Sequence, residues 1–271
     1  MTTREKCYII SICEVAHFFA KFVIKVNDMA INVTIWHEYR HEKTDERIRA
    51  LYPNGIHAKL KSFLESDDVK VTLASLDEPN QGLPDELLES TDVLVWWGHV
   101  AHNEVSDDLV QKIRDRVYSG MGFLPIHSAH HSKPFKAILG TTGNLTWSRN
   151  KQTAIVWNVA PTHPIAEGIP SHFELFEEMY GEPFFIPKPD DLIFATWYED
   201  GNIFRGGVTF TRGLGKIFYF HPGHESCTSF DNEYVQKILQ NAVKWCAPIN
   251  KADGFVNDGC IRQDEPIFKK R

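Results

Sequence analysis

The chain has 271 residues, of which 42% are hydrophobic and 24% are charged, as is ordinary for a globular protein. Its net charge is −7 and its Lys and Arg residues form no basic block, so we expect no nucleic-acid partner, because phosphate binding needs clustered cations. The five cysteines form no C-x-x-C pair. This favours free thiols in a reducing cytoplasm over a disulfide scaffold.

The N-terminal region is apolar but interrupted. Charged and histidine side chains occur repeatedly within residues 7–26, which a membrane span or a signal peptide tolerates poorly. We therefore expect no membrane partner. We predict an N-terminal extension over residues 1–28, a single domain over residues 29–248 and an irregular tail over residues 249–271.

Apolar runs and helical periodicity alternate through the first half of the domain. The helical pattern is clearest over residues 56–65 and in the segment that Ser106 can cap and Gly120 can end. Strands are predicted at residues 31–36, 69–73, 93–97 and 123–126. Because these strands are apolar on both faces, they predict a parallel sheet covered by helices on both sides.

The second half has a different pattern. Residues 144–211 are rich in Trp, Pro and Gly, and they contain short strand-like runs at 153–157, 192–197 and 207–210. A strand at 217–220 and a helix capped by Asp231 complete the domain. We predict an α/β fold, a flavodoxin-like three-layer sandwich with a mainly parallel sheet and a mixed or antiparallel extension.

Three predicted strands end at a histidine. His99, His127 and His221 each follow a strand directly or by one residue. A second histidine follows three residues after each of them, at His102, His130 and His224. Because ligands bind beyond the carboxyl ends of parallel strands, the sequence predicts that these histidines converge on one site.

Imidazole is the commonest protein ligand for zinc, and a catalytic zinc needs three protein ligands and an open position. His99, His127 and His221 are therefore candidate ligands for Zn²⁺ or another divalent transition metal. The alternative is a cluster of hydrogen-bonded histidines without metal, because some of the thirteen histidines fall near strand ends by chance. We expect no nucleotide cofactor because the chain lacks a Walker or dinucleotide glycine fingerprint.

Further polar and aromatic residues complete the candidate site. Glu178 lies in an acidic and aromatic segment, where it can serve as a general base or as a solvated loop residue. Aromatic side chains such as Trp147 suit the apolar faces of sugar rings, although core packing explains aromatic residues equally well. The candidate catalytic residues are His127, Ser128, His130, Glu178, His221, His224 and Glu225. The candidate substrate contacts are His41, Trp97, His102 and Tyr180.

Several motifs, taken in order, resemble the trehalose-utilisation (ThuA-like) family. They are residues 93–99 with Ala101-His102, residues 126–130, residues 162–165, residues 178–180, and residues 213–220 leading into Gly223-His224-Glu225. The resemblance implies a fold like that of class I glutamine amidotransferases. It also implies a role in the catabolism of trehalose or related disaccharides, at the level of keto-sugar intermediates.

Class I amidotransferases place a nucleophilic Cys in a tight turn after a strand, whereas here that turn carries His127 and Ser128. A Cys-dependent amidotransferase is therefore not expected. We favour an isomerase, lyase or hydrolase that acts on a small-molecule sugar at the histidine centre. The alternatives are a hydrolase with Ser128 as nucleophile, His221 or His224 as base and Glu225 as orienting group, or a non-catalytic sugar-binding or regulatory protein. The sequence leaves a homo-oligomer open.

Overall fold

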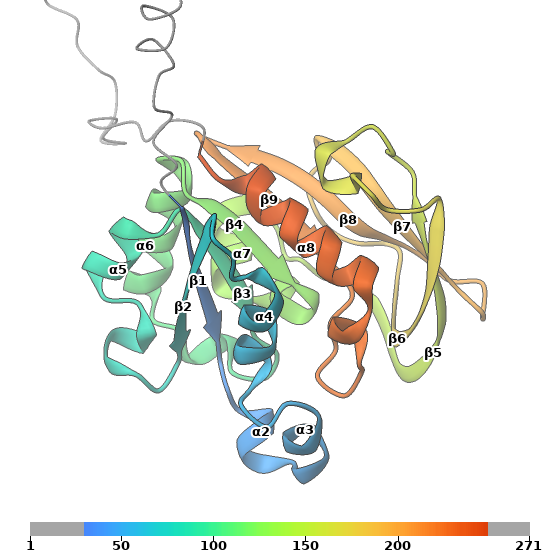
Figure 1. Ribbon diagram of the computed structural model, residues 1–271, viewed down its shortest axis with the longest axis horizontal. Helices are drawn as coiled ribbons and strands as arrows, with labels where there is room; N and C mark the ends of the chain where they lie inside the picture. The colour runs from blue at the N-terminus through green and yellow to red at the C-terminus, as the bar shows by residue number, and fades with distance from the viewer. Residues whose placement is uncertain (1–29, 249–271) are drawn as a thin grey trace, which may run out of the picture. The chain divides into compact units, whose positions relative to one another are not determined.

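The computed structural model describes residues 30–248, so the predicted N-terminal extension and C-terminal tail lie outside the described residues. Over residues 30–248, the strands form one nine-stranded sheet in the order β2-β1-β3-β4-β9-β8-β7-β5-β6 (Figure 1). No helix in this range is long and apolar enough to cross a bilayer.

The sheet has a parallel half and an antiparallel half. Its strands are β1 Ile31–His37, β2 Val69–Ser75, β3 Val93–Trp97, β4 Gly122–Ile126, β5 Thr146–Asn158, β6 His172–Gly181, β7 Asp191–Tyr198, β8 Ile203–Arg212 and β9 Gly215–Phe220. Pairing is parallel from β2 through β1, β3 and β4 to β9. It is antiparallel from β9 through β8, β7 and β5 to β6. The expectation of a mainly parallel sheet was therefore wrong, because the antiparallel extension is as large as the parallel half.

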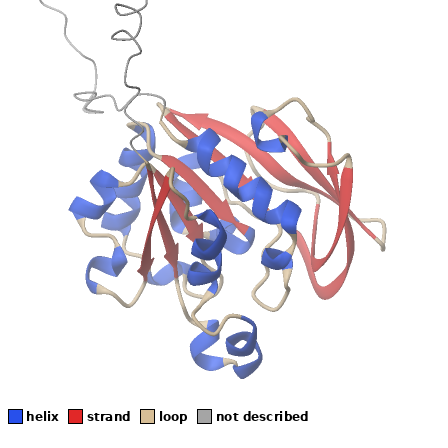
Figure 2. Ribbon diagram, in the orientation of Figure 1, coloured by secondary structure: helices blue, strands red, loops and turns tan. Residues whose placement is uncertain are grey.

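Helices cover both faces of the parallel half (Figure 2). The helices are α2 His41–Thr44, α3 Glu46–Leu51, α4 Ile56–Leu64, α5 Asp85–Ser90, α6 Asp107–Tyr118, α7 Lys133–Leu139 and α8 Glu233–Cys246. Short 3-10 turns lie at Pro79–Gly82, His102–Glu104, His127–His131, Pro164–Ala166 and Ser229–Asp231.

Two hydrophobic cores hold these layers together, because successive side chains of a strand point to opposite faces. On β3, Val93 and Val95 belong to the core that α4 and α8 cover. Leu94 and Trp96 belong to the other core, which α5, α6 and α7 cover. Figure 1 shows α4 and α8 on the near side of the sheet. Strands β3 and β4 are thus buried on both faces, as their continuous apolar sequences predict.

Helix capping matches the sequence at one helix and differs at another. Ser106 caps α6 as predicted, because its side chain accepts a hydrogen bond from the Leu109 N–H. The cap of α8 is Asn232, which accepts from the N–H groups of Tyr234 and Val235. The prediction of Asp231 as the cap was wrong by one residue, because Asp231 ends the preceding 3-10 turn.

Strand β6 was not predicted from the sequence, although it positions part of the site. Its first half alternates, with Phe173 and Leu175 buried and Glu174 exposed. From Glu177 onward every residue of the strand is buried, because side chains from other elements cover both faces. The acidic segment, for which a solvated loop was one alternative, is therefore a buried strand end.

Candidate functional site

The strand-end histidines meet at the carboxyl edge of the parallel half. The ring centroids of His99 and His127 lie 6.3 Å apart, and those of His127 and His221 lie 5.6 Å apart. Strand β6 brings Tyr180 to the same place, where its ring stacks on His127 at 4.9 Å. Segments remote in sequence thus form one cluster of imidazoles, carboxylates and a phenol.

His127 occupies a strained position directly after β4. Its φ is +53°, in the left-handed region that side chains other than glycine seldom adopt. Tyr219 and His221 fix the residue, because the Tyr219 hydroxyl donates to the His127 carbonyl at 3.0 Å and His127 Nδ1 donates to the His221 carbonyl at 2.9 Å. A carbonyl only accepts, so Nδ1 carries a proton, while Nε2 lies 3.3 Å from the Tyr180 hydroxyl and carries a second proton when the ring is charged.

Glu178 faces the Nε2 nitrogen of His127. Its Oε2 lies 3.3 Å from His127 Nε2, and its Oε1 lies 3.6 Å from His224 Nε2. Burial alone would raise the pKa of Glu178, but its pairing with His127 and the nearby imidazoles lower it below the ordinary value. Burial likewise opposes protonation of His127, but Glu178 and neighbouring carboxylates raise the pKa of His127. Glu178 is therefore an ionised carboxylate held between two imidazoles.

His224 carries its proton on the opposite nitrogen from His127. Its Nδ1 accepts a hydrogen bond from the Ser226 backbone N–H at 3.1 Å. The neutral ring therefore carries its proton on Nε2, which lies 3.4 Å from Glu225 Oε1 and also faces Glu178. Burial and then the neighbouring His127 lower the pKa of His224 to about 4, so the ring is neutral at pH 7.

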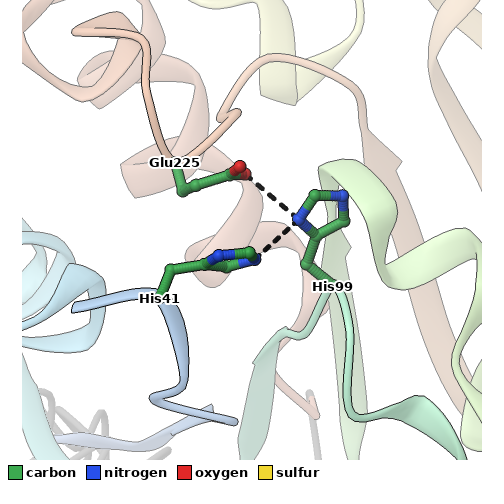
Figure 3. Close-up of side chains that lie close together, drawn as sticks. All are labelled: His41, His99 and Glu225. Carbon is green, nitrogen blue, oxygen red and sulfur yellow. Dashed lines mark hydrogen bonds and ion pairs between the residues drawn. The ribbon is translucent and has the colours of Figure 1, made fainter. Parts of the chain in front are cut away.

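His41, His99 and Glu225 form a second group beside the first (Figure 3). His41 Nε2 lies 2.8 Å from His99 Nδ1, which in turn lies 3.3 Å from Glu225 Oε2. The potential ligand atoms of this group lie within 4.8 Å of one another, and so do those of His127, Glu178 and His224. Either group has the composition of a divalent metal site.

Two buried carboxylates organise the loops that carry these groups. Glu38 accepts hydrogen bonds from the backbone N–H groups of His99, Val100 and Ala101, at 2.7, 2.9 and 2.9 Å. Glu177 does the same for the loop after β9, where it accepts from the N–H groups of Gly223 and His224 at 2.8 and 3.3 Å. Neither role was predicted. In the sequence, the only feature that points to either residue is an acidic side chain close to a candidate site residue.

A pocket opens onto this cluster. It is lined by His99, His102, Ser128, His130, His131, Leu145, Trp147, Glu178 and Tyr180. Trp147 has 54% of its surface exposed, whereas Glu178 has only 5%. His130 Nδ1 donates to the Gly143 carbonyl at 2.6 Å, which directs its other nitrogen away from that contact. The pocket thus combines an exposed aromatic face with a buried carboxylate.

Three candidates from the sequence make other contacts than expected. Trp97 is fully buried and its indole N–H donates to the Gly223 carbonyl at 3.0 Å, so it supports a loop and does not line the pocket. His221 is also fully buried, faces the Tyr198 hydroxyl at 3.2 Å and belongs to neither ligand group. The Ser128 hydroxyl donates to the Gly98 carbonyl at 2.7 Å. Within residues 30–248 it has no hydrogen bond to an imidazole, the contact that a serine nucleophile needs.

These features define an α/β protein with a large mixed sheet and an imidazole–carboxylate site at the carboxyl edge of its parallel strands. The chain belongs to the ThuA family, described as trehalose utilisation, whose model matches residues 32–246. A search among curated proteins found no match.

Solved structures with the same fold come from several bacteria. A ThuA-like protein from Parabacteroides merdae ATCC 43184 has 15% identity and a TM-score of 0.61, with 80% of this chain and 89% of that chain covered. A ThuA-like protein from Bacteroides uniformis ATCC 8492 has 13% identity and a TM-score of 0.57, with coverages of 80% and 91%. A cytoplasmic protein from Salmonella typhimurium has 15% identity and a TM-score of 0.55, with coverages of 80% and 99%. At these identities the likeness shows the fold.

Proposed function

We propose that this protein is an enzyme of disaccharide catabolism that acts on trehalose, or a related disaccharide, in an oxidised keto form. Its family supports the substrate class, since the family is described by trehalose utilisation. The buried free thiols of Cys227 and Cys246, and the cytoplasmic description of the Salmonella protein, support a cytoplasmic location.

The observation that carries this proposal is the placement of Glu178. It is an ionised carboxylate at the buried end of a pocket, with His127 on one oxygen and His224 near the other. A carboxylate so placed is suited to general base catalysis, because it is fixed in position and faces the space where a ligand binds. A module that only binds sugars has no need of this pairing.

The pocket walls suit a sugar ring. Trp147 offers an exposed aromatic face at the pocket, and Tyr180 offers a phenol beside Glu178. Burial, together with nearby tyrosines and carboxylates, raises the pKa of Tyr180 well above its ordinary value. Its hydroxyl therefore stays protonated at neutral pH and donates a hydrogen bond to a sugar oxygen.

Glu178 would then remove a proton from the carbon next to the ketone. The electron pair moves onto the carbonyl oxygen as an enolate, where hydrogen-bond donors of the pocket stabilise the charge. For isomerisation, the proton returns to the former carbonyl carbon, and the hydroxyl proton of the first carbon passes to the enolate oxygen. For elimination, the carbonyl re-forms as the bond from the adjacent carbon to the glycosidic oxygen breaks, and protonated Glu178 returns its proton to that oxygen, which leaves as an alcohol. Both outcomes share the first step, which assigns Glu178 the central role.

Turnover of a trehalose oxidised to a ketone on one glucose ring tests the proposal. Glu178→Gln keeps the shape of the side chain but removes the base. We expect kcat/KM to fall by about 10²- to 10⁴-fold, the usual contribution of a general base. Glu174→Gln is the matched control, because Glu174 lies exposed on the same strand and should leave turnover unchanged.

Full turnover by a folded Glu178→Gln protein would disprove the role of Glu178. Tight sugar binding with no turnover by the unmodified protein would favour the non-catalytic alternative. Covalent labelling of Ser128 by a serine-directed phosphonate would favour the hydrolase alternative.

A further inference from the structure

We propose that His41, His99 and Glu225 bind one divalent transition metal ion, with Zn²⁺ as the reference ion, beside the pocket that contains Glu178. This ligand set differs from His99, His127 and His221, the set that the spacing of the strand ends predicts. It uses the second residue after strand β3, the first residue of α2 and the loop after β9.

The distances within the group suit a single ion. Ligand atoms around a tetrahedral Zn²⁺ with bonds of about 2.0–2.1 Å lie roughly 3.3–3.4 Å apart. His99 Nδ1 lies 2.8 Å from His41 Nε2 and 3.3 Å from Glu225 Oε2, and ligand atoms of the three residues all lie within 4.8 Å of one another. Figure 3 shows the three side chains pointing toward one another. Two imidazoles and one carboxylate are a set found in catalytic zinc sites with an open position.

Glu225 supplies an independent observation. Its side chain is 6% exposed, and its Oε2 accepts no hydrogen bond from the described residues. Leaving a carboxylate oxygen buried and unpaired is costly, because the charge has lost its water. His99 Nδ1 at 3.3 Å is an ion-pair contact without hydrogen-bond geometry, and a bound cation would satisfy this oxygen.

The surroundings hold the ligands in place. Glu38 fixes the backbone of His99 through three N–H groups of residues 99–101. The other oxygen of Glu225 faces the protonated Nε2 of His224 at 3.4 Å. Such outer partners orient ligands in known metal sites and strengthen them as donors. The His99 side chain is 27% exposed, which leaves a side of the site open to a ligand in the pocket.

The neighbouring group of His127, Glu178 and His224 suits a metal less well. A metal binds the lone pair of an imidazole nitrogen, and His224 Nε2 has none available while its Nδ1 accepts the Ser226 N–H. His224 therefore fits the outer shell of the proposed site. Its ring lies 5.8 Å from that of His99, so the metal and Glu178 would occupy adjacent walls of the pocket.

This position gives the ion a chemical role that rests on the proposed function. A cation at His99 would act as a Lewis acid on a carbonyl or hydroxyl oxygen of a ligand in the pocket. Glu178, on the adjacent wall, would then act on the carbon next to that oxygen.

Metal binding by the full chain, purified without a histidine tag and stripped with a chelator, tests the site without reference to activity. Titration calorimetry with Zn²⁺ and metal analysis should show one ion per chain. His41→Asn and Glu225→Gln should each weaken binding by more than about 100-fold, since even outer-shell changes typically cost about 10- to 100-fold. Circular dichroism and thermal unfolding establish that each variant is folded. His41 is only half-buried, so its variant keeps the test valid if Glu225→Gln does not fold.

Two controls separate this site from its neighbours. His131→Asn changes an exposed histidine of the same pocket and should leave Zn²⁺ affinity unchanged. Glu178→Gln should also retain the ion, although it loses turnover. Failure of the stripped protein to bind a stoichiometric ion would overturn the site. Loss of the ion in Glu178→Gln, with binding retained in His41→Asn, would place the metal in the other group. Zn²⁺ binding as expected without sugar turnover would leave the site standing and reject the proposed function.

Discussion

His127 shows how one residue can join the fold to the site. Its positive φ turns the chain sharply after β4, a geometry that costs about 1–3 kcal/mol and persists only where surrounding contacts enforce it. Hydrogen bonds of its ring and its carbonyl supply that enforcement.

Glu177 is a second residue that joins the fold to the site, because its carboxylate holds the loop after β9 in place. Its carboxylate accepts hydrogen bonds from the N–H groups of Gly223 and His224 and from the Ser229 hydroxyl. Glu177→Ala leaves these buried donors unpaired, at about 1–3 kcal/mol each. We expect the free energy of unfolding to fall by at least about 3 kcal/mol, measured by urea denaturation.

Glu174→Ala is the matched control for Glu177→Ala, because Glu174 is exposed on the same strand. It should change the free energy of unfolding by no more than about 0.5 kcal/mol. Equal denaturation midpoints for the two variants would show that Glu177 does not hold the loop after β9.

Among the elements, α8 has the most regular apolar face. Val235, Ile238, Leu239 and Ala242 are buried at helical spacing against the parallel strands. The same periodicity is visible in the sequence, so both the helix and its buried face could be predicted. Its first residue could not, because Asp231 and Asn232 are both good caps and only the path of the preceding turn selects between them.

Replacement of the cap tests this assignment. Asn232→Ala removes the acceptor for the N–H groups of Tyr234 and Val235, so it should lower the free energy of unfolding by about 1 kcal/mol. Asp231→Ala should cost less, because it removes only an exposed ion pair with Lys59. A larger loss in Asp231→Ala, by urea denaturation, would reverse the assignment.

Strand β6 is an element that the sequence pattern did not predict. Its outer half alternates as an exposed strand does, but its inner half carries Glu177, Glu178 and Tyr180 in a fully buried run. Polar side chains in such a run predict a loop unless their partners are known. Those partners are His127 and the loop after β9, which are remote in sequence.

At the scale of the whole molecule, the parallel half was predictable, and so was an antiparallel extension, but strand β6 and the size of the extension were not. Strands β3 and β4 are continuous apolar runs, and their parallel pairing alone brings His99 and His127 to one edge. The convergence of the histidines therefore followed from the sequence. Which imidazole faces which carboxylate depends on loop conformations, and for this reason the pairing of His41 and His99 with Glu225 was not foreseen.

The central claim is that Glu178 removes a proton from a carbon next to a ketone. Incubation of the keto-disaccharide with the enzyme in D₂O, followed by NMR of sugar and product, measures this step directly. We predict that deuterium enters the recovered substrate at that carbon with the unmodified protein, because the enolate can be reprotonated there, and that entry falls by at least about 10²-fold in Glu178→Gln. Neither product keeps a hydrogen at that carbon, so product that retains the original hydrogen there, or undiminished entry in the variant, would contradict the account.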